Sequence, residues 1–222
     1  MARHFIREIE RLKKMVLALS AVVEESVHKA VNAIERRDAA LAQRVLDGDI
    51  DIDHMEVDVE EECLKILALH QPVAADLRFI VAVMKLNSDL ERIGDLAGNI
   101  AKRAIFLARE PRIEIPPQIP AMAEKAQAML KRTLDALVNN DSAAARQVMF
   151  SDDEVDALHK QVGDYVKERM KTHPETIEGC LQIFHAARHL ERISDHASNI
   201  AEDVIYMIDG EIVRHKNGGK TE

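Results

Sequence analysis

Eight carboxylates in this chain form four pairs, and the two members of each pair lie four residues apart. The pairs are Asp49/Asp53, Glu91/Asp95, Asp152/Asp156 and Glu191/Asp195. Residues four apart share one face of a helix, where two like charges destabilise it by roughly 0.2–0.5 kcal/mol. Carboxylate oxygens are also the ligands that hard cations prefer. Each pair therefore indicates either a solvated acidic face or part of a cation site.

The pairs recur because the chain repeats itself. Residues 90–101, LERIGDLAGNIA, match residues 190–201, LERISDHASNIA, at nine of twelve positions. Upstream of these segments the offset is 103 instead of 100, and it relates Asp49 to Asp152 and Asp53 to Asp156. The three-residue difference falls in the turns that contain Pro72 and Pro174. A repeat of this length predicts two copies of one supersecondary unit.

Composition and periodicity predict that both units are helical. Glycine (8) and proline (6) are scarce among the 222 residues and aromatic residues make up 3%, which excludes an all-β or Rossmann-type fold. Apolar residues recur at helical spacing between a few breakers. The predicted helices cover residues 4–37, 39–70, 74–108 and 120–139, followed by a fifth from the 139–141 turn to about 171 and a sixth to about 209.

The predicted fold class is therefore all-α, with two tandem, sequence-similar three-helix bundles. Residues 1–110 form the first bundle, residues 111–120 a proline-rich linker and residues 121–212 the second bundle, while residues 213–222 are expected to be a disordered tail. The short turns predict that consecutive helices run antiparallel.

Antiparallel packing places residues at equal distances from a turn side by side. Glu91 is then level with Asp53 and Asp95 with Asp49, each at the same distance from the turn near residue 72. In the second half, Glu191 is level with Asp156 and Asp195 with Asp152. Four carboxylates should therefore gather at one level in each bundle.

Such a gathering predicts a multi-carboxylate cation site in each bundle. Oxygen ligands suit Mg, Mn or Fe, and the nearby histidines His28, His159 and His196 could admit Zn. The alternative is that Arg92, Arg192 and neighbouring lysines neutralise the carboxylates in surface networks.

Other classes of function fit less well. A ferritin-like di-iron bundle requires a pair of Glu-x-x-His motifs, and only the segment from Glu25 to His28 has this form. None of the GxSxG, HExxH, GxxxxGK[ST] or GxGxxG motifs is present. A metal-dependent helical-bundle enzyme, either ferritin-like or phosphoryl-processing, remains the alternative function, and a purely structural scaffold is a third.

Charge and cysteine content indicate which partners and which cellular compartment to expect. A net charge of −9 argues against a nucleic-acid partner. Cys63 and Cys180 lie in apolar helical contexts without CxxC spacing, as expected of buried thiols in a reducing compartment. Neither a signal-peptide core nor a long apolar run is present. We expect a soluble, cytoplasmic protein that does not insert into membranes.

The same residues carry a family resemblance. They lie in three segments: VLDGDIDIDHMEVDVEEEC (45–63), HQPVAADLRFI (70–80) and the doubled LERIGD/LERISD followed by A-x-N-I. In these segments the chain resembles the PhoU family of phosphate-specific transport accessory proteins. The resemblance spans nearly the whole chain.

The resemblance implies a cytoplasmic, dimeric, non-enzymatic protein. It implies an E(D)xxxD-type motif at Glu91/Asp95 and at Glu191/Asp195, able to hold mono- or multinuclear metal clusters, with the other two pairs facing them. The implied role is negative regulation of phosphate-starvation signalling and of high-affinity phosphate uptake. The implied partners are the ATPase of the phosphate ABC transporter and a phosphate-sensing histidine kinase. Leu96 departs from His196 in the repeat, so the two sites are expected to differ.

Overall fold

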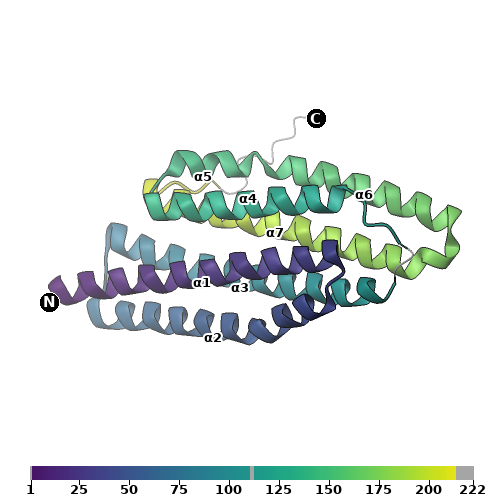
Figure 1. Ribbon diagram of the computed structural model, residues 1–222. Helices are drawn as coiled ribbons and strands as arrows, with labels where there is room; N and C mark the ends of the chain where they lie inside the picture. The colour runs from purple at the N-terminus through teal and green to yellow at the C-terminus, as the bar shows by residue number, and fades with distance from the viewer. Residues whose placement is uncertain (1, 111–112, 214–222) are drawn as a thin grey trace, which may run out of the picture.

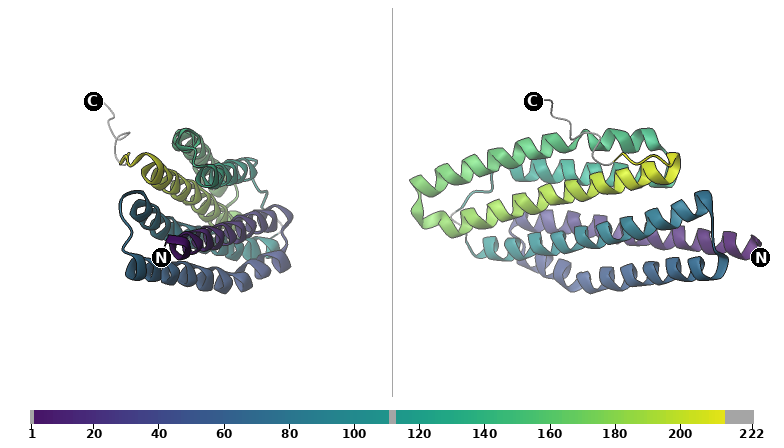
Figure 2. Two further views of the ribbon diagram at one scale, coloured as in Figure 1. Left: turned by 90° about the vertical axis from the view of Figure 1, so that its left-hand side faces the viewer. Right: turned by 180° about the vertical axis from the view of Figure 1, so that it is seen from behind.

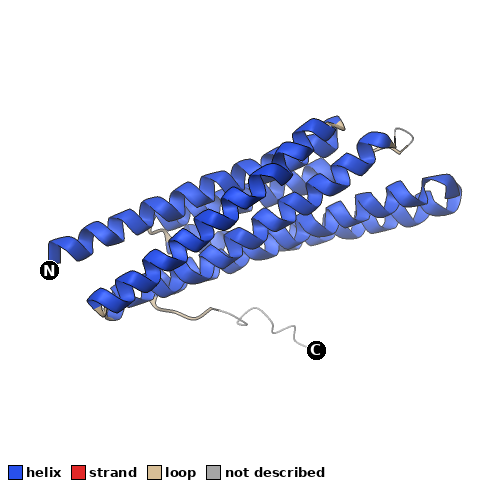
Figure 3. Ribbon diagram, turned by 90° about the horizontal axis from the view of Figure 1, so that it is seen from below, coloured by secondary structure: helices blue, strands red, loops and turns tan. Residues whose placement is uncertain are grey.

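The computed structural model describes residues 2–110 and 113–213. In the first half, the helices are α1 (Ala2–Arg36), α2 (Ala39–His70) and α3 (Ala74–Arg109). In the second half, they are α4 (Gln118–Asn139), α5 (Ser142–Met149), α6 (Asp152–Thr172), the 3-10 turn η1 (Pro174–Thr176) and α7 (Ile177–Asp209). No strand occurs in the described ranges (Figure 3). The first four predicted helices begin and end within two residues of their predicted bounds, and the all-α class is confirmed.

The structure describes parts of the predicted linker and of the predicted tail. Helix α4 begins at Gln118, so the later part of the predicted linker is helical. Pro111 and Arg112 lie outside the described residues, as do residues 214–222 of the predicted tail. Val213, the first residue of that tail, is buried. No described helix combines the length and the apolar character that crossing a membrane requires.

Two aspartates begin equivalent helices in the two halves. The Asp38 carboxylate accepts a hydrogen bond from the Leu41 N–H at 2.9 Å, at the start of α2. Asp141 accepts one from the Ala144 N–H at 2.9 Å, at the start of α5. These aspartates are 103 residues apart, and each satisfies a backbone donor that has no partner within its helix. The aspartate cap at the start of α2 therefore has a counterpart in the repeat.

The prediction of one continuous fifth helix is wrong. The chain forms α5 and α6 instead, with a break at Phe150 and Ser151. The N–H groups of these two residues reach back only three residues, to Gln147 and Val148. Three acidic residues, 152–154, follow in the first turn of α6, where the positive end of the helix dipole favours negative charge. Apolar periodicity continues across the break, and it therefore concealed the new helix start.

The two bundles pack side by side along their length, mainly through α3 and α7 (Figures 1 and 2). Polar contacts between described residues join these helices at three places along their length. Lys85 lies 3.5 Å from Asp203, His196 lies 2.7 Å from Asp89, and Arg103 donates to Gln182 at 2.9 Å. The residue numbers of these contacts rise along α3 while those of their partners fall along α7, so the two helices are antiparallel. The two repeats are therefore related by an approximate twofold rotation.

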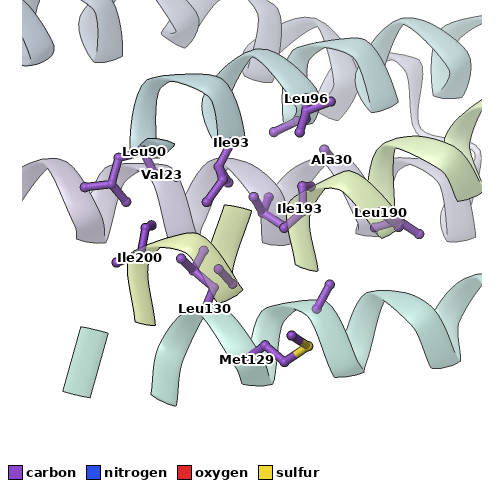
Figure 4. Close-up of a cluster of buried hydrophobic side chains, with 14 of the residues drawn as sticks. Val23, Ala30, Leu90, Ile93, Leu96, Met129, Leu130, Leu190, Ile193 and Ile200 are labelled. Atoms are coloured by element: carbon purple, nitrogen blue, oxygen red, sulfur yellow. The ribbon is translucent and has the colours of Figure 1, made fainter. Parts of the chain in front are cut away.

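A shared apolar core fills the space between the bundles. Ile93 and Ile193, which are equivalent in the repeat, are fully buried in it. Figure 4 shows them together with side chains from α1 and α4. The contacts between α3 and α7 place these isoleucines at nearly the same level, close to the approximate twofold axis. The repeats therefore share one core, which fixes the position of one bundle against the other.

Two helical glycines provide opposite tests of helix packing. A Cβ atom at Gly48, within α2, would meet no other atom within 4 Å, so Gly48→Ala should raise the free energy of unfolding by about 0.5–1 kcal/mol through helix propensity. A Cβ at Gly94, within α3, would lie 3.0 Å and 3.1 Å from Ile52 side-chain carbons. Because Ile52 is buried, Gly94→Ala should lower that free energy by about 1 kcal/mol. Urea denaturation of both variants measures the two effects, and equal changes would contradict the close approach of α2 to α3.

Candidate functional site

The four carboxylates of the first half face one another across α2 and α3. Burial raises the pKa of Asp49, and the charges of Asp95 and Asp53 raise it further. Burial also raises the pKa of Glu91, followed by the charges of Asp95 and Asp53. The charge of Asp95 on α3 thus acts on Asp49 of α2, and the charge of Asp53 on α2 acts on Glu91 of α3, as the predicted register requires. The structure therefore brings the four predicted residues of this half together.

Close helix packing makes this gathering possible. A Cβ atom at Gly98 would lie 3.7 Å from one Asp49 carboxylate oxygen and 3.8 Å from the other. The Asp49 carboxylate is therefore directed at the backbone of α3, beside a position that has no side chain. One turn earlier, Gly94 meets Ile52. The two glycines let α2 approach and bring its carboxylates against α3.

Asn87 connects the acidic face of α2 to α3 and was missed by the sequence analysis. Its side-chain amide is buried and donates to the Glu56 backbone oxygen at 2.9 Å and to the Glu56 carboxylate at 3.2 Å. Burial is the main cause that raises the pKa of Glu56. A lone asparagine within an otherwise apolar row of α3 was the available signal, because a buried amide requires hydrogen-bond partners.

The second half repeats the arrangement across α6 and α7. Burial raises the pKa of Asp152 to about 6, with further contributions from the charges of Asp195 and Asp156. The pKa of Asp195 is raised by burial, then by the charges of Glu191 and Asp156. For Glu191, burial raises the pKa first, followed by Asp156 and Asp152. All four predicted residues of this half are therefore also neighbours.

The second site differs from the first in two respects. Asp152 is the first residue of α6, whereas Asp49 lies within α2. One Asp152 carboxylate oxygen, Oδ1, is buried and has no hydrogen-bond partner among the described residues. Buried acceptors are seldom left in this state. The expected inequality of the two sites therefore has a structural basis beyond the change from Leu96 to His196.

The three histidines suggested as extra ligands lie in different places. His159 lines a cavity of about 460 Å³ together with Asp156 and Glu191, and its ring stacks on Phe184 with centroids 5.4 Å apart. Burial lowers the pKa of His159, which favours the neutral imidazole that binds metals. His196 instead bonds Asp89 on α3, and the exposed His28 interacts with Asn32 on its own helix. Of these three histidines, His159 thus lines a cavity together with two of the predicted acidic ligands.

The carboxylates are neighbours without forming a closed ligand set. Within residues 2–110 and 113–213, no three acidic, cysteine or histidine side chains are placed to hold one metal ion. Arg92 and Arg192 are exposed, and none of the ion pairs in these ranges joins either arginine to a carboxylate. Their positive charges nevertheless partly offset the raised pKa values of Glu91 and Glu191. One member of each carboxylate pair is exposed and the other is half-buried, so the sites combine partial burial with mutual repulsion.

Cys63 and Cys180 are free, buried thiols as predicted, and burial raises the pKa of Cys63 to about 12.

Asp152 gives this repulsion a measurable pH dependence. Because its pKa is raised from 3.8 to about 6 in the folded state, the native protein binds more protons than the unfolded chain between these values. The stabilising contribution of protonated Asp152 to the free energy of unfolding is therefore present at low pH and is lost as the pH rises through 6. Asp152→Asn should raise the free energy of unfolding by about 1 kcal/mol at pH 7.5, after allowance for partial exposure of the group, and by nothing near pH 4.

The exposed neighbour Asp153 is the matched control for this measurement. Asp153→Asn removes a favourable interaction with the start of α6 and should lower stability by a few tenths of a kcal/mol at neutral pH, roughly the value of one helix-terminal charge. Urea denaturation at several pH values compares the two variants. A gain from Asp152→Asn that persisted unchanged at pH 4 would contradict the assigned cause.

Fold and site together define a class of protein: tandem three-helix units that share one core and carry matching acidic clusters across their second and third long helices. The PhoU domain model matches residues 16–104 and 119–204, one match in each half. The chain belongs to the PhoU family.

Relatives and solved structures match the chain almost from end to end. It is 39% identical over 211 residues to the phosphate-specific transport system accessory protein PhoU homolog of Aquifex aeolicus, covering 95% of this chain and 96% of that protein. It is 41% identical to the homolog from Pseudomonas aeruginosa, covering 96% and 89%. The crystal structure of PhoU from Pseudomonas aeruginosa superimposes with a TM-score of 0.89 at 40% identity, covering 93% of this chain and 100% of that one.

A more divergent structure has the same architecture. The phosphate transport system regulatory protein PhoU from Streptococcus pneumoniae is 30% identical and superimposes with a TM-score of 0.88, covering 94% of this chain and 99% of that chain. The predicted family and the predicted pair of PhoU-like repeats are therefore confirmed.

Proposed function

We propose that this chain is a non-enzymatic, cytoplasmic accessory protein of phosphate transport that represses phosphate-starvation signalling and restrains high-affinity phosphate uptake. The observation that carries this proposal is the similarity of both halves, over nearly the full length, to proteins named as accessory to phosphate transport. The solved structure named as a phosphate transport regulator has the same fold.

We further propose that each half binds divalent or multinuclear metal through its four carboxylates. Burial, followed by mutual repulsion, raises the pKa values of Asp49, Glu91, Asp152, Glu191 and Asp195, and cations would relieve that repulsion. The unpartnered oxygen of Asp152 supports this proposal as well. Oxygen-only ligands suit Mg, Mn or Fe, and His159 would let the second site accept Zn.

A metal bound in this way would stabilise the outer helices. It would link α2 to α3 in the first half and α6 to α7 in the second, because each cluster spans those helices. In this proposal the protein acts as a homodimeric adaptor between the ATPase of the phosphate ABC transporter and a phosphate-sensing histidine kinase. Metal would hold its docking surfaces in one shape, and the adaptor would stabilise the repressing form of the kinase.

Thermal unfolding with manganese tests the metal sites. We expect MnCl₂ to raise the melting temperature of the purified protein, because a ligand that binds only the folded state stabilises it. The double variant Asp95→Asn/Asp195→Asn should lose this increase. The variant Asp76→Asn/Glu178→Gln, which changes exposed acids outside both clusters, should retain it. Elemental analysis without bound metal, combined with no response to manganese, would rule out the metal sites.

Gene deletion tests the regulatory role. Loss of the protein should leave phosphate-responsive transcription active at high phosphate, and the wild-type gene should restore repression. Capture of the tagged protein from cells at high and low phosphate should recover the transporter ATPase and the kinase. Phosphatase and ferroxidase assays of the metal-loaded protein should show no activity. Unchanged transcription after deletion would contradict the proposed function.

A further inference from the structure

The outward face of α2 carries an exposed apolar stripe, which consists of Ile50, Val57 and Leu64. Their side chains are 57%, 48% and 51% exposed. Spacing by seven residues places them on one face of the helix, over a length of about 21 Å. Isolated apolar residues are common on protein surfaces, but three in one row form a continuous contact line.

The stripe takes no part in building the bundle. The opposite face of α2 supplies the core residues Ile52, Val59 and Ile66, which are fully buried. Helix α2 packs on α1 and α3 and lies at the outer edge of the molecule (Figure 1). The stripe points away from both neighbours, so the fold does not explain its apolar character.

The second repeat provides an internal comparison. At the offset of 103 residues, the positions of the stripe correspond to Asp153, Lys160 and Lys167. All three side chains are exposed on α6, which occupies the equivalent place in the other bundle. The same helix position is therefore polar in one half and apolar in the other. Since the fold accepts charged residues there, the apolar stripe indicates a contact that only the first half makes.

Acidic residues border the stripe. Nine of the sixteen residues 47–62 are Asp or Glu, and none is Lys or Arg. Helical geometry places Glu60 along one side of the stripe and Glu61 along the other. Within the described ranges, no ion pair involves either residue. The face thus presents an apolar line with a negative charge, not compensated by an ion pair, on each side.

We propose that this face of α2 binds an amphipathic basic helix of a partner protein. The partner helix would pack apolar residues, spaced three, four and seven apart, onto the stripe and direct Lys or Arg side chains at the acidic borders. A second copy of α2 fits poorly, because it would bring acidic rows against acidic rows. The proposal stands on this surface alone, independently of the metal sites and of the partners proposed above.

A designed peptide provides the probe. A fluorescein-labelled helical peptide of about 21 residues, with leucines at the a and d positions and lysines beside them, is titrated with the full-length protein, and anisotropy is measured. The variant Ile50→Gln/Val57→Gln/Leu64→Gln keeps the charge and should bind the peptide at least tenfold more weakly. The matched variant Val138→Gln/Ile177→Gln/Leu181→Gln changes exposed apolar residues on other helices and should bind within twofold of wild type.

Charge variants and controls complete the test. Glu60→Gln/Glu61→Gln should weaken binding several-fold at low salt, while Glu168→Gln/Glu175→Gln should not, and a peptide with glutamates in place of the lysines should not bind. Far-UV circular dichroism verifies that each variant is folded. Equal peptide affinity of the wild type and the stripe variant would overturn the proposal. So would sedimentation showing that the stripe variant converts a dimer into monomers, since the stripe would then bind a second copy of the chain.

Discussion

Replacing Ile193 by alanine should lower the free energy of unfolding by about 3 kcal/mol. Ile193 is fully buried in the core between the two bundles, and removal of a buried isoleucine side chain combines lost apolar burial with a residual cavity. The position lies beside Ile93 near the approximate twofold axis, where α1, α3, α4 and α7 contribute to one cluster (Figure 4). The cavity cannot close without moving one bundle against the other, so little relaxation is expected.

Urea denaturation, followed by circular dichroism at 222 nm, measures this loss. Ile177→Ala is the matched control, because Ile177 lies on the same helix and is 40% exposed; its effect should stay below about 1 kcal/mol. Both variants should unfold in one cooperative transition, since the repeats share a core. Two separate transitions, or equal losses in the two variants, would contradict the single core.

Replacing Arg37 by alanine should lower the free energy of unfolding by about 2–4 kcal/mol. Its guanidinium donates to the backbone oxygens of Leu107 and Glu110 at 2.6 Å each, and also to that of Ile113. One side chain thus holds the end of α3 and the start of the linker against the turn between α1 and α2. Hydrogen bonds from a charged donor are worth roughly 1.5–3 kcal/mol each, and loss of three together is less than additive.

The backbone at Arg37 allows a second comparison. Its φ of 53° lies in the left-handed region, which glycine adopts more easily than alanine by about 1 kcal/mol. Arg37→Gly should therefore lose less stability than Arg37→Ala by about that amount. Arg36→Ala, at the exposed neighbouring position, should change stability by no more than about 0.5 kcal/mol. Thermal and urea unfolding measure all three, and equal losses at both positions would remove the assigned role from Arg37.

The acidic clusters were predictable because two regular patterns determine them. Spacing by four places each pair on one helix face, and the antiparallel hairpin then places Glu91 beside Asp53 and Asp95 beside Asp49. Both inferences depend only on helix geometry and on the position of a turn. The Coulombic links between these residues agree with that register. Whether the clusters bind metal stays a prediction.

The histidines and the fifth helix show where pattern arguments fail. Spacing does not reveal that His196 bonds Asp89, because Asp89 belongs to the other repeat and is brought there by the packing of α3 on α7. The break at Phe150 and Ser151 leaves the apolar periodicity intact, so it is visible only as a run of acidic residues at a new helix start. Each miss depends on an interaction that periodicity does not encode.

The sequence by itself determined the two helical repeats, their turns and the four level carboxylate pairs, because these follow from local periodicity and from duplication within one chain. Only the tertiary structure decided how the repeats pack. The antiparallel approach of α3 to α7, the anchoring of the linker by Arg37 and the outward direction of the α2 stripe depend on contacts between residues far apart in the chain. Such contacts arise from the shapes of packed side chains, which no short-range pattern specifies.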